Sequence, residues 1–284
     1  MDISKVNITI SEELNNSKMN SLIKLYETYL DLKKGDDFDF DKFNQFAIVH
    51  HSNSIEGSTL SKEETYLLLS ENLTPKNKPL EHTLMAIDHY AALKYVIGLA
   101  ESKTELSDII IRKISSLIMD KTGSEISSIA GDFDSSKGDY RKVTVRAGNT
   151  TFMDYQKVPG NVIELLNYIN DNINKAKSFQ QINEFAFDAH FQMVSIHPFA
   201  DGNGRLSRLL MNYVQHYHKT PLTAIYLENK SDYFKALEDT RKKKDITIFR
   251  KFMFDQTTKN LLEKIEELSQ KQVSKKGKGM NFLF

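Results

Sequence analysis

Residues His197 to Arg208 read HPFADGNGRLSR, a stretch that combines a titratable base, a carboxylate, two glycines and two arginines. Apolar residues recur at helical spacing both before and after it. We therefore expect a loop that joins two helices and opens the second, not the turn of a β-hairpin. Because a helix N-terminus carries about half a positive charge and unpaired N–H groups, the loop predicts an anion-binding site.

The side chains of this loop suit the transfer of phosphate-containing groups. Arg205 and Arg208 stand three residues apart, so they are neighbours on one helical face and can bind phosphate oxygens. Asp201 offers a hard oxygen ligand for magnesium, and an EF-hand is excluded because the other ligands at its spacing are missing. His197 is the candidate base for a substrate hydroxyl, since the ordinary pKa of histidine lies near neutrality. The alternative is a structural histidine.

Composition indicates a soluble globular chain whose charge is balanced. Of the 284 residues, 40% are apolar, and 38 lysines and arginines balance 38 aspartates and glutamates, so no overall field favours nucleic acid or a membrane as partner. The absence of cysteine excludes disulfides, thiol nucleophiles and zinc–thiolate sites. Since the sequence shows neither a signal-peptide pattern nor a long uncharged apolar run, we expect a cytoplasmic protein.

Helical periodicity predominates along the chain, so the expected fold class is mostly α. Apolar spacing predicts helices around 22–30, 66–69, 84–95, 110–118, 162–169, 185–196, 206–213, 233–237 and 249–265. Ser61 and Glu64 form a candidate capping box before the second of these. The segment from Gly138 to Met153 alone has the pattern of a β-hairpin, with Gly148-Asn149 as its turn.

The loop resembles the signature of Fic-domain proteins, His-Pro-Phe-x-Asp-Gly-Asn-Gly-Arg-x-x-Arg, at every specified position. This resemblance implies a Fic-type helical bundle with one β-hairpin flap, and transfer of AMP from ATP to a Ser, Thr or Tyr hydroxyl of a target protein. It implies that His197 is the general base and that Asp201 binds Mg²⁺. The residues that it implies for phosphate or ATP binding are Gly202, Asn203, Gly204, Arg205 and Arg208.

Gly138-Asp139-Tyr140-Arg141, followed by Val143 and Val145, resembles the first part of the family's flap, a hairpin that pairs with the backbone of the target. Such pairing by strand addition suits a target that is read with little side-chain specificity. A solvent-facing hairpin is the alternative that the pattern alone leaves open. The candidate flap or nucleotide residues are Ala147, Gly148, Asn149 and Thr150.

Residues 52–57, Ser-Asn-Ser-Ile-Glu-Gly, read on their own as the end of a helix with Gly57 at the C′ position. Beside the Fic signature they resemble the inhibitory motif Ser/Thr-x-x-x-Glu-Gly/Asn, which implies inhibitory roles for Ser52, Glu56 and Gly57. A bidentate pair between Glu56 and Arg208 would keep this arginine from the γ-phosphate and misalign the α-phosphate for in-line attack. The resemblance also implies a possible de-AMPylase activity, in which Glu56 positions the water that removes AMP from a modified target.

On the nucleotide side, Tyr233 and Phe234 resemble an aromatic pair beside the nucleotide, with core packing as the alternative. An asparagine that contacts adenine in some relatives falls at Arg241 here, or is displaced by the lysines at 242–244. Because this contact to adenine is missing at its expected place, the sequence does not predict a strict preference for ATP.

We expect four parts: an N-terminal helical region over residues 1–104 with an inhibitory helix at about 40–57, a Fic domain over 105–250, a C-terminal helix over 251–273, and a flexible basic tail over 274–284. A homodimer and self-modification are both compatible with the sequence. Two other functions stay open. One is phosphoryl transfer, as in Doc-like relatives that usually carry lysine where Gly204 stands, and the other is a non-catalytic module that senses nucleotide.

Overall fold

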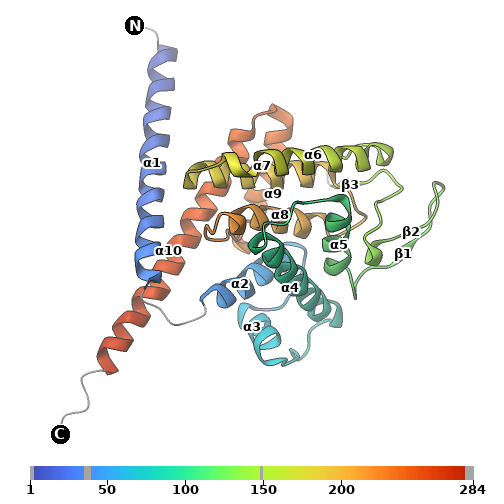
Figure 1. The fold of residues 1–284 in the computed structure, drawn as a ribbon, viewed down its shortest axis with the longest axis horizontal. Coiled ribbons are helices and arrows are strands. Elements are labelled where there is room, and N and C mark those ends of the chain that lie inside the picture. Colours follow the sequence, from blue (N-terminus) through green and yellow to red (C-terminus); the bar gives the residue numbers. More distant parts are fainter. Residues whose placement is uncertain (1–2, 35–39, 148–149, 279–284) are drawn as a thin grey trace. The chain divides into compact units, whose positions relative to one another are not determined.

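The computed structural model describes residues 3–34, 40–147 and 150–278 of the chain (Figure 1). The chain divides into two compact units, of which the larger comprises residues 40–253. The smaller unit comprises residues 1–39 together with residues 254–284. All candidate site residues, from Ser52 to Arg241, belong to the larger unit.

The larger unit is mostly helical, as the sequence predicts. Its helices are α2 (Phe40–Ile55), α3 (Lys62–Glu71), α4 (Leu80–Glu101), α5 (Asp108–Ile118), α6 (Val158–Asn172), α7 (Phe179–Ile196), α8 (Asn203–Tyr217), α9 (Lys230–Lys243) and the first part of α10 (Ile246–Lys278). Short 3₁₀ helices are η1 (Ser135–Lys137), η2 (Tyr155–Lys157), η3 (Ile173–Lys175) and η4 (Leu227–Asn229).

Helix α8 forms the centre of the larger unit (Figure 1). It packs against α7 and α4, and it also contacts α5 and α2. Twelve of its 15 residues are buried, including polar ones at its N-terminal end. A helix that is surrounded in this way must bury its charged side chains, so each of them needs a partner from a neighbouring helix.

Side-chain caps explain where several of these helices begin. The capping box predicted at Ser61 is present, because Ser61 Oγ accepts from the Glu64 N–H at 3.1 Å and Glu64 Oε2 accepts from the Ser61 N–H at 2.8 Å. Ser178 and Gln181 form a second capping box at the start of α7. Helix α7, which carries the candidate base at its end, is thus held at its N-terminus by its own sequence.

Two antiparallel ribbons of two strands each occur in the described residues. Strand β3 (Arg146–Ala147) pairs with β4 (Thr150–Thr151), with Arg146 opposite Thr151. This ribbon is the predicted hairpin, and its turn, Gly148 and Asn149, lies outside the described residues. Strand β1 (Glu125–Ile126) pairs with β2 (Phe133–Asp134). The second ribbon was not predicted, because two-residue strands among serines and aspartates show no apolar alternation.

The smaller unit contains α1 (Ile3–Lys33) and the part of α10 from Phe254 onward. Leu22 and Tyr29 of α1, and Leu261 and Leu268 of α10, are buried. Helix α10 runs to Lys278, so the first five residues of the expected tail are helical, and residues 279–284 lie outside the described part.

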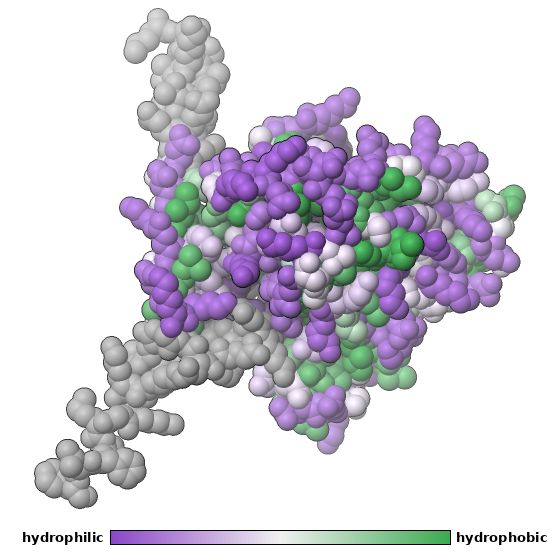
Figure 2. Space-filling view, in the orientation of Figure 1, coloured by the Kyte–Doolittle hydropathy of each residue, from purple (hydrophilic) through white to green (hydrophobic). Residues whose placement is uncertain are grey.

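The surface of the larger unit drawn in Figure 2 is mainly hydrophilic, with apolar side chains in small patches. Exposed large apolar residues include Leu73, Leu80 and Ile129. Within residues 3–34, 40–147 and 150–278, no helix has the length and apolar character needed to cross a membrane.

Candidate active site

His197 lies at the end of α7, in a left-handed conformation with φ 53° and ψ 61°. Phe152, which follows β4, stacks on the imidazole with ring centroids 3.8 Å apart. Burial lowers the pKa of His197 to about 4, and the Val194 backbone carbonyl opposes this only in part. The imidazole is therefore neutral at neutral pH and can accept a proton.

The loop after His197 leads into the N-terminus of α8, where the sequence predicts an anion site. Gly202 is the N-cap residue with φ 77°, and a Cβ at this position would come within 3.2 Å of Ile118 Cγ2 and Met119 Sδ. The conformation and the close approach both favour glycine. The first backbone N–H groups of α8 have no partner within the helix, so they can bind phosphate oxygens.

Asn203 shapes the loop with its side chain. The amide oxygen accepts from the Phe199 N–H at 2.9 Å, and Nδ2 donates to the Phe199 carbonyl at 2.8 Å. The side chain is buried. Because both ends of the amide are occupied in this way, the backbone N–H is the group of Asn203 that is best placed for a phosphate.

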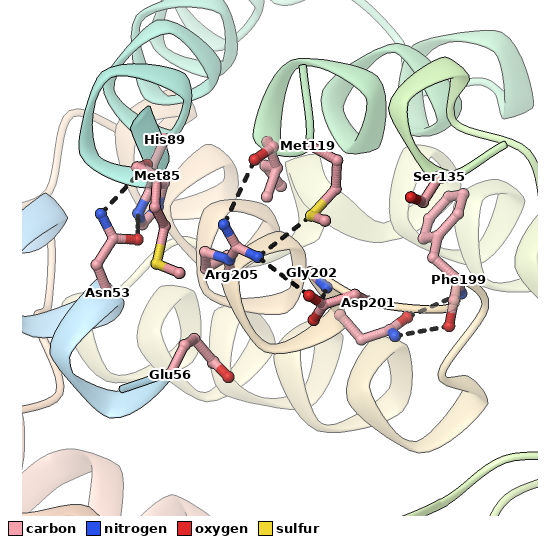
Figure 3. A network of polar contacts seen from close by, with 12 residues as sticks. Asn53, Glu56, Met85, His89, Met119, Ser135, Phe199, Asp201, Gly202 and Arg205 are labelled. Carbon is pink, nitrogen blue, oxygen red and sulfur yellow. Dashed lines mark hydrogen bonds and ion pairs between the residues drawn. The ribbon is translucent and has the colours of Figure 1, made fainter. Parts of the chain in front are cut away.

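Arg205 points from α8 toward the end of α5 (Figure 3). It is buried, and it donates to the Ile118 carbonyl at 3.4 Å and to Met119 Sδ at 3.2 Å. Its Nη2 lies 3.8 Å from Asp201 Oδ2. These neutral and distant contacts leave most of the positive charge of Arg205 available to an anion at the start of α8.

Asp201 is the residue that fits a divalent cation. Its side chain is 69% exposed, and one carboxylate oxygen accepts from the Gly202 N–H at 2.5 Å. Among the described residues no cluster of three or more acidic or histidine side chains could hold a metal. Magnesium often takes a single carboxylate, several waters and substrate phosphates, so an exposed Asp201 beside the anion site suits it.

Arg208 is buried and bound by the end of α2. Nη2 contacts Glu56 Oε1 at 2.5 Å and donates to the Ser52 carbonyl at 3.1 Å, while Nε donates to Ser52 Oγ at 2.7 Å. The predicted contact between Glu56 and Arg208 is thus present, but the predicted bidentate geometry is wrong. Ser52 Oγ accepts from Nε, and the hydrogen bond to Glu56 joins Nη2 to a single carboxylate oxygen.

Glu56 is held as a carboxylate by this contact. Burial alone would raise its pKa, but the charge and hydrogen bond of Arg208 outweigh burial and lower it. Gly57 has φ 109° and its N–H donates to the Ser54 carbonyl, while the Ser58 N–H donates to the Asn53 carbonyl. This is a Schellman motif. The turn at Gly57 ends α2 directly after Glu56. The residue that makes the proposed inhibitory contact is therefore part of the motif that ends the helix.

Asn53 and His89 hold α2 in place, and the sequence did not single out either residue. Asn53 Oδ1 lies 2.9 Å from His89 Nδ1, and Asn53 Nδ2 donates to the Met85 carbonyl at 3.4 Å (Figure 3). His89 is fully buried, and burial lowers its pKa well below the usual range. A neutral His89 can donate from Nδ1 to Asn53. No signal in the sequence indicates His89, because it lies opposite the apolar residues that recur at helical spacing in 84–95, and yet it is buried.

The first part of the hairpin is fixed to α5. Gly138 has φ 71°, and a Cβ there would lie 2.0 Å from the Arg112 carbonyl oxygen. Arg112 pairs with Asp139 at 2.7 Å, and the Tyr140 hydroxyl donates to Asp108. Gly138, Asp139 and Tyr140, which resemble the family's flap, thus each contribute to the contact with α5.

The nucleotide-side candidates separate in the structure. Tyr233 is 1% exposed and its hydroxyl lies 2.9 Å from His190 Nε2, so it packs in the core, while Phe234 is 48% exposed. The Arg241 guanidinium lies 5.7 Å from the ring centroids of both Phe152 and Phe191. Arg241 is therefore beside the hairpin. Ala147 and Thr150 pair across the ribbon.

A methyl group at Gly204 is expected to loosen the contact between Glu56 and Arg208. A Cβ at Gly204 would lie 2.3 Å from Glu56 Oε1, so the carboxylate would have to move. Gly204→Ala should destabilise the wild-type chain by about 1 to 3 kcal/mol, because Arg208 would lose its charged partner. The same change should be neutral or stabilising in Glu56→Gly, since alanine favours helix over glycine.

Denaturant unfolding of the wild type, both single variants and the double variant measures this difference as a coupling free energy. Equal effects of Gly204→Ala in the two backgrounds would contradict the close approach of Glu56 to α8.

Known proteins resemble this chain in sequence and in fold. Residues 105–215 match the Fic/DOC family. The chain is 27% identical over 245 residues to protein adenylyltransferase Fic of Aedes aegypti, covering 86% of this chain and 45% of that protein. It is 29% identical over 218 residues to the protein of the same name from Drosophila willistoni, covering 76% and 41%. The chain thus spans less than half the length of these relatives.

A solved structure gives the same fold. The Fic-domain-containing signaling protein of Bacteroides thetaiotaomicron superposes with a TM-score of 0.74 and 24% sequence identity. The match covers 88% of this chain and 98% of that chain. The similarity therefore extends well beyond residues 105–215.

Proposed function

We propose that this chain transfers AMP from ATP to a hydroxyl group of a protein, and that Glu56 keeps it in a resting state. The observation that carries the proposal is a neutral base, His197, whose loop leads directly into a helix N-terminus with two buried arginines. A base and an anion site in this order suit transfer of a phosphate-containing group to a hydroxyl. The name of the curated relatives, protein adenylyltransferase Fic, supports AMP as the group.

In the proposed reaction, His197 takes the proton of the target hydroxyl while the hydroxyl oxygen bonds to the α-phosphorus of ATP. The bond from that phosphorus to the bridging oxygen breaks, and pyrophosphate leaves. The N–H groups at the start of α8, with Arg205 and Arg208, would bind the phosphate oxygens. Mg²⁺, if bound at Asp201, would neutralise part of the phosphate charge.

The partner that we propose is a target protein whose backbone pairs with the β3–β4 ribbon. In the described part of the chain this ribbon has two strands, so strand addition at an edge is available to a target. Phe152 connects the ribbon to the imidazole of His197 by direct stacking. A hydroxyl presented on the ribbon would thus be near the base. The chain itself, or a second copy, could be such a target.

AMP transfer is favoured over Doc-type phosphoryl transfer by the surroundings of Gly204. Doc-like relatives usually carry lysine at this position, and any side chain here would meet the carboxylate of Glu56. The same crowding supports Glu56 as an inhibitory residue, because its carboxylate lies at the start of α8, where phosphates would bind.

ATP labelled in parallel at the α- or γ-phosphate tests the proposal in the Glu56→Gly chain, with lysate of the protein's own cells as a source of targets. We expect the α-label to persist on protein and the γ-label to leave with pyrophosphate. Persistence of the γ-label would indicate phosphoryl transfer instead. Tight ATP binding with neither label on protein would indicate a nucleotide-sensing module.

A further inference from the structure

Arg141 is a buried cation at the start of the β3–β4 hairpin, with 1% of its surface exposed. Its side chain donates to three backbone carbonyls: Nε to His197 at 2.7 Å, Nη1 to Val143 at 2.6 Å and Nη2 to Met153 at 2.7 Å. Its backbone N–H donates to the Pro198 carbonyl at 3.1 Å. Arg141 therefore forms hydrogen bonds both to the hairpin and to the loop that begins at His197.

The two hairpin carbonyls belong to opposite sides of the ribbon. Val143 precedes β3 and Met153 follows β4, so one guanidinium holds both ends of the hairpin together. Phe152 adds to this connection, because its N–H donates to the Val145 carbonyl across the ribbon at 3.1 Å and its ring stacks on His197. The base of the ribbon and the histidine thus share one set of contacts.

The third carbonyl is that of His197 itself. This residue has a positive φ, which is uncommon for a residue with a side chain. Its carbonyl accepts from a charged donor, and such hydrogen bonds are stronger than those between neutral groups. Arg141 therefore fixes the peptide group that carries the imidazole.

We propose that Arg141 is a positioning residue for AMP transfer, which fixes the imidazole of His197 relative to the hairpin that presents the target hydroxyl. This inference rests on the proposed function. The choice of arginine supports this proposal. Burial of a cation is costly, and within the described residues no carboxylate forms a hydrogen bond with the Arg141 guanidinium. A guanidinium meets that cost with a rigid fork of donors, and an ammonium group has no such fork.

The charge of Arg141 provides a measurement that does not depend on catalysis. Burial is the main cause of the low pKa of His197, and the positive charge of Arg141 lowers that pKa further. Removal of this charge should therefore raise the pKa of His197. Replacement by lysine should keep the charge but lose the three-carbonyl geometry.

The variants Arg141→Met and Arg141→Lys, made in the Glu56→Gly chain, test the proposal, and Arg112→Met is the matched control. Arg112 donates to the Gly138 carbonyl at 2.9 Å and pairs with Asp139 at the same end of the hairpin, so the control removes an arginine there that does not bond His197. The measurements are kcat for α-label incorporation, the Kd of ATP, amide hydrogen exchange over 143–153, and NMR titration of the His197 ring.

Both Arg141 variants should lose about 10- to 100-fold in kcat, since displacement of a reacting group by about 1 Å can cost up to about 100-fold, and the Kd of ATP should be unchanged. The Phe152 amide should exchange faster in both. The pKa of His197 should rise in Arg141→Met and stay closer to that of the parent in Arg141→Lys. The Arg112→Met control should lose clearly less kcat than either Arg141 variant. If Arg141→Met does not fold, Arg141→Lys carries the test.

Parallel losses of kcat and ATP affinity, or an equal loss of kcat in the control, would overturn the proposal, because Arg141 would then only support the fold. Unchanged kcat with faster exchange would overturn it too. If the Glu56→Gly parent transfers no AMP, the proposed function fails. In that case, an unchanged exchange rate of the Phe152 amide and an unchanged pKa of His197 in Arg141→Met would overturn the proposed link between the hairpin and His197. Changes in both would support this link.

Discussion

His197→Ala in the Glu56→Gly chain should lower the rate of α-label incorporation by about 10²- to 10⁴-fold, the usual contribution of a positioned general base. The structure supports this effect because the imidazole is neutral, fixed by Phe152 stacking and held through its own backbone carbonyl. Alanine removes the proton acceptor but leaves the start of α8 unchanged. The affinity for ATP should therefore be retained.

His216→Ala is a suitable control for this experiment. His216 lies in the last turn of α8, where its Nε2 is 3.3 Å from Glu101 Oε1, and it has no contact with the loop at 197–202 in the described structure. The control should keep the full rate. A loss below about tenfold for His197→Ala would mean that the hydroxyl is deprotonated by another group.

The pH profile follows from the same histidine. Because burial lowers the pKa of His197 to about 4, the base should stay unprotonated as the pH falls from about 8 to about 5. We expect kcat/KM of the Glu56→Gly chain to show no loss from His197 over this range. An exposed histidine with the ordinary pKa would be mostly protonated at about pH 5 and would lose roughly 30-fold.

The loop and the helices around it could be predicted because their determinants are local. Helical spacing on both sides, with glycine at the junction, predicts that α8 begins after the loop, and it begins at Asn203 with Gly202 as N-cap. The capping box at Ser61 follows from four residues in a row. In each case the interacting groups lie within one or two helical turns of each other.

The partners of buried polar groups could not be predicted in this way. Asn53 and His89 are 36 residues apart, and Arg141 and His197 are 56 apart. Periodicity shows which face of a helix is buried but not which groups meet there. The contact between Glu56 and Arg208, 152 residues apart, was expected from a family resemblance alone. Even there, the hydrogen bond from Arg208 Nε to Ser52 could not be predicted, because it depends on the orientation of α2.

Glu56→Gly should raise the rate of α-label incorporation by about 10- to 150-fold, which is the effect of restoring one charge-assisted contact of about 1.5 to 3 kcal/mol in the transition state. In the resting structure Arg208 Nη2 is held by Glu56, and the carboxylate lies at the start of α8 against Gly204. Glycine removes the charged partner of Nη2, so this part of the guanidinium can bind a phosphate while Ser52 still bonds Nε. It also removes a negative charge that opposes the triphosphate.

Glu71→Gly is the matched control, because Glu71 is an exposed glutamate at the C-terminal end of the neighbouring helix α3. It should leave the rate unchanged. Glu56→Gln separates charge from bulk: it keeps the side chain's size but loses the ionic bond, so its rate should lie between those of the wild type and Glu56→Gly. If Glu56→Gly binds ATP more tightly without faster transfer, then Glu56 controls nucleotide binding and not the alignment of the α-phosphate.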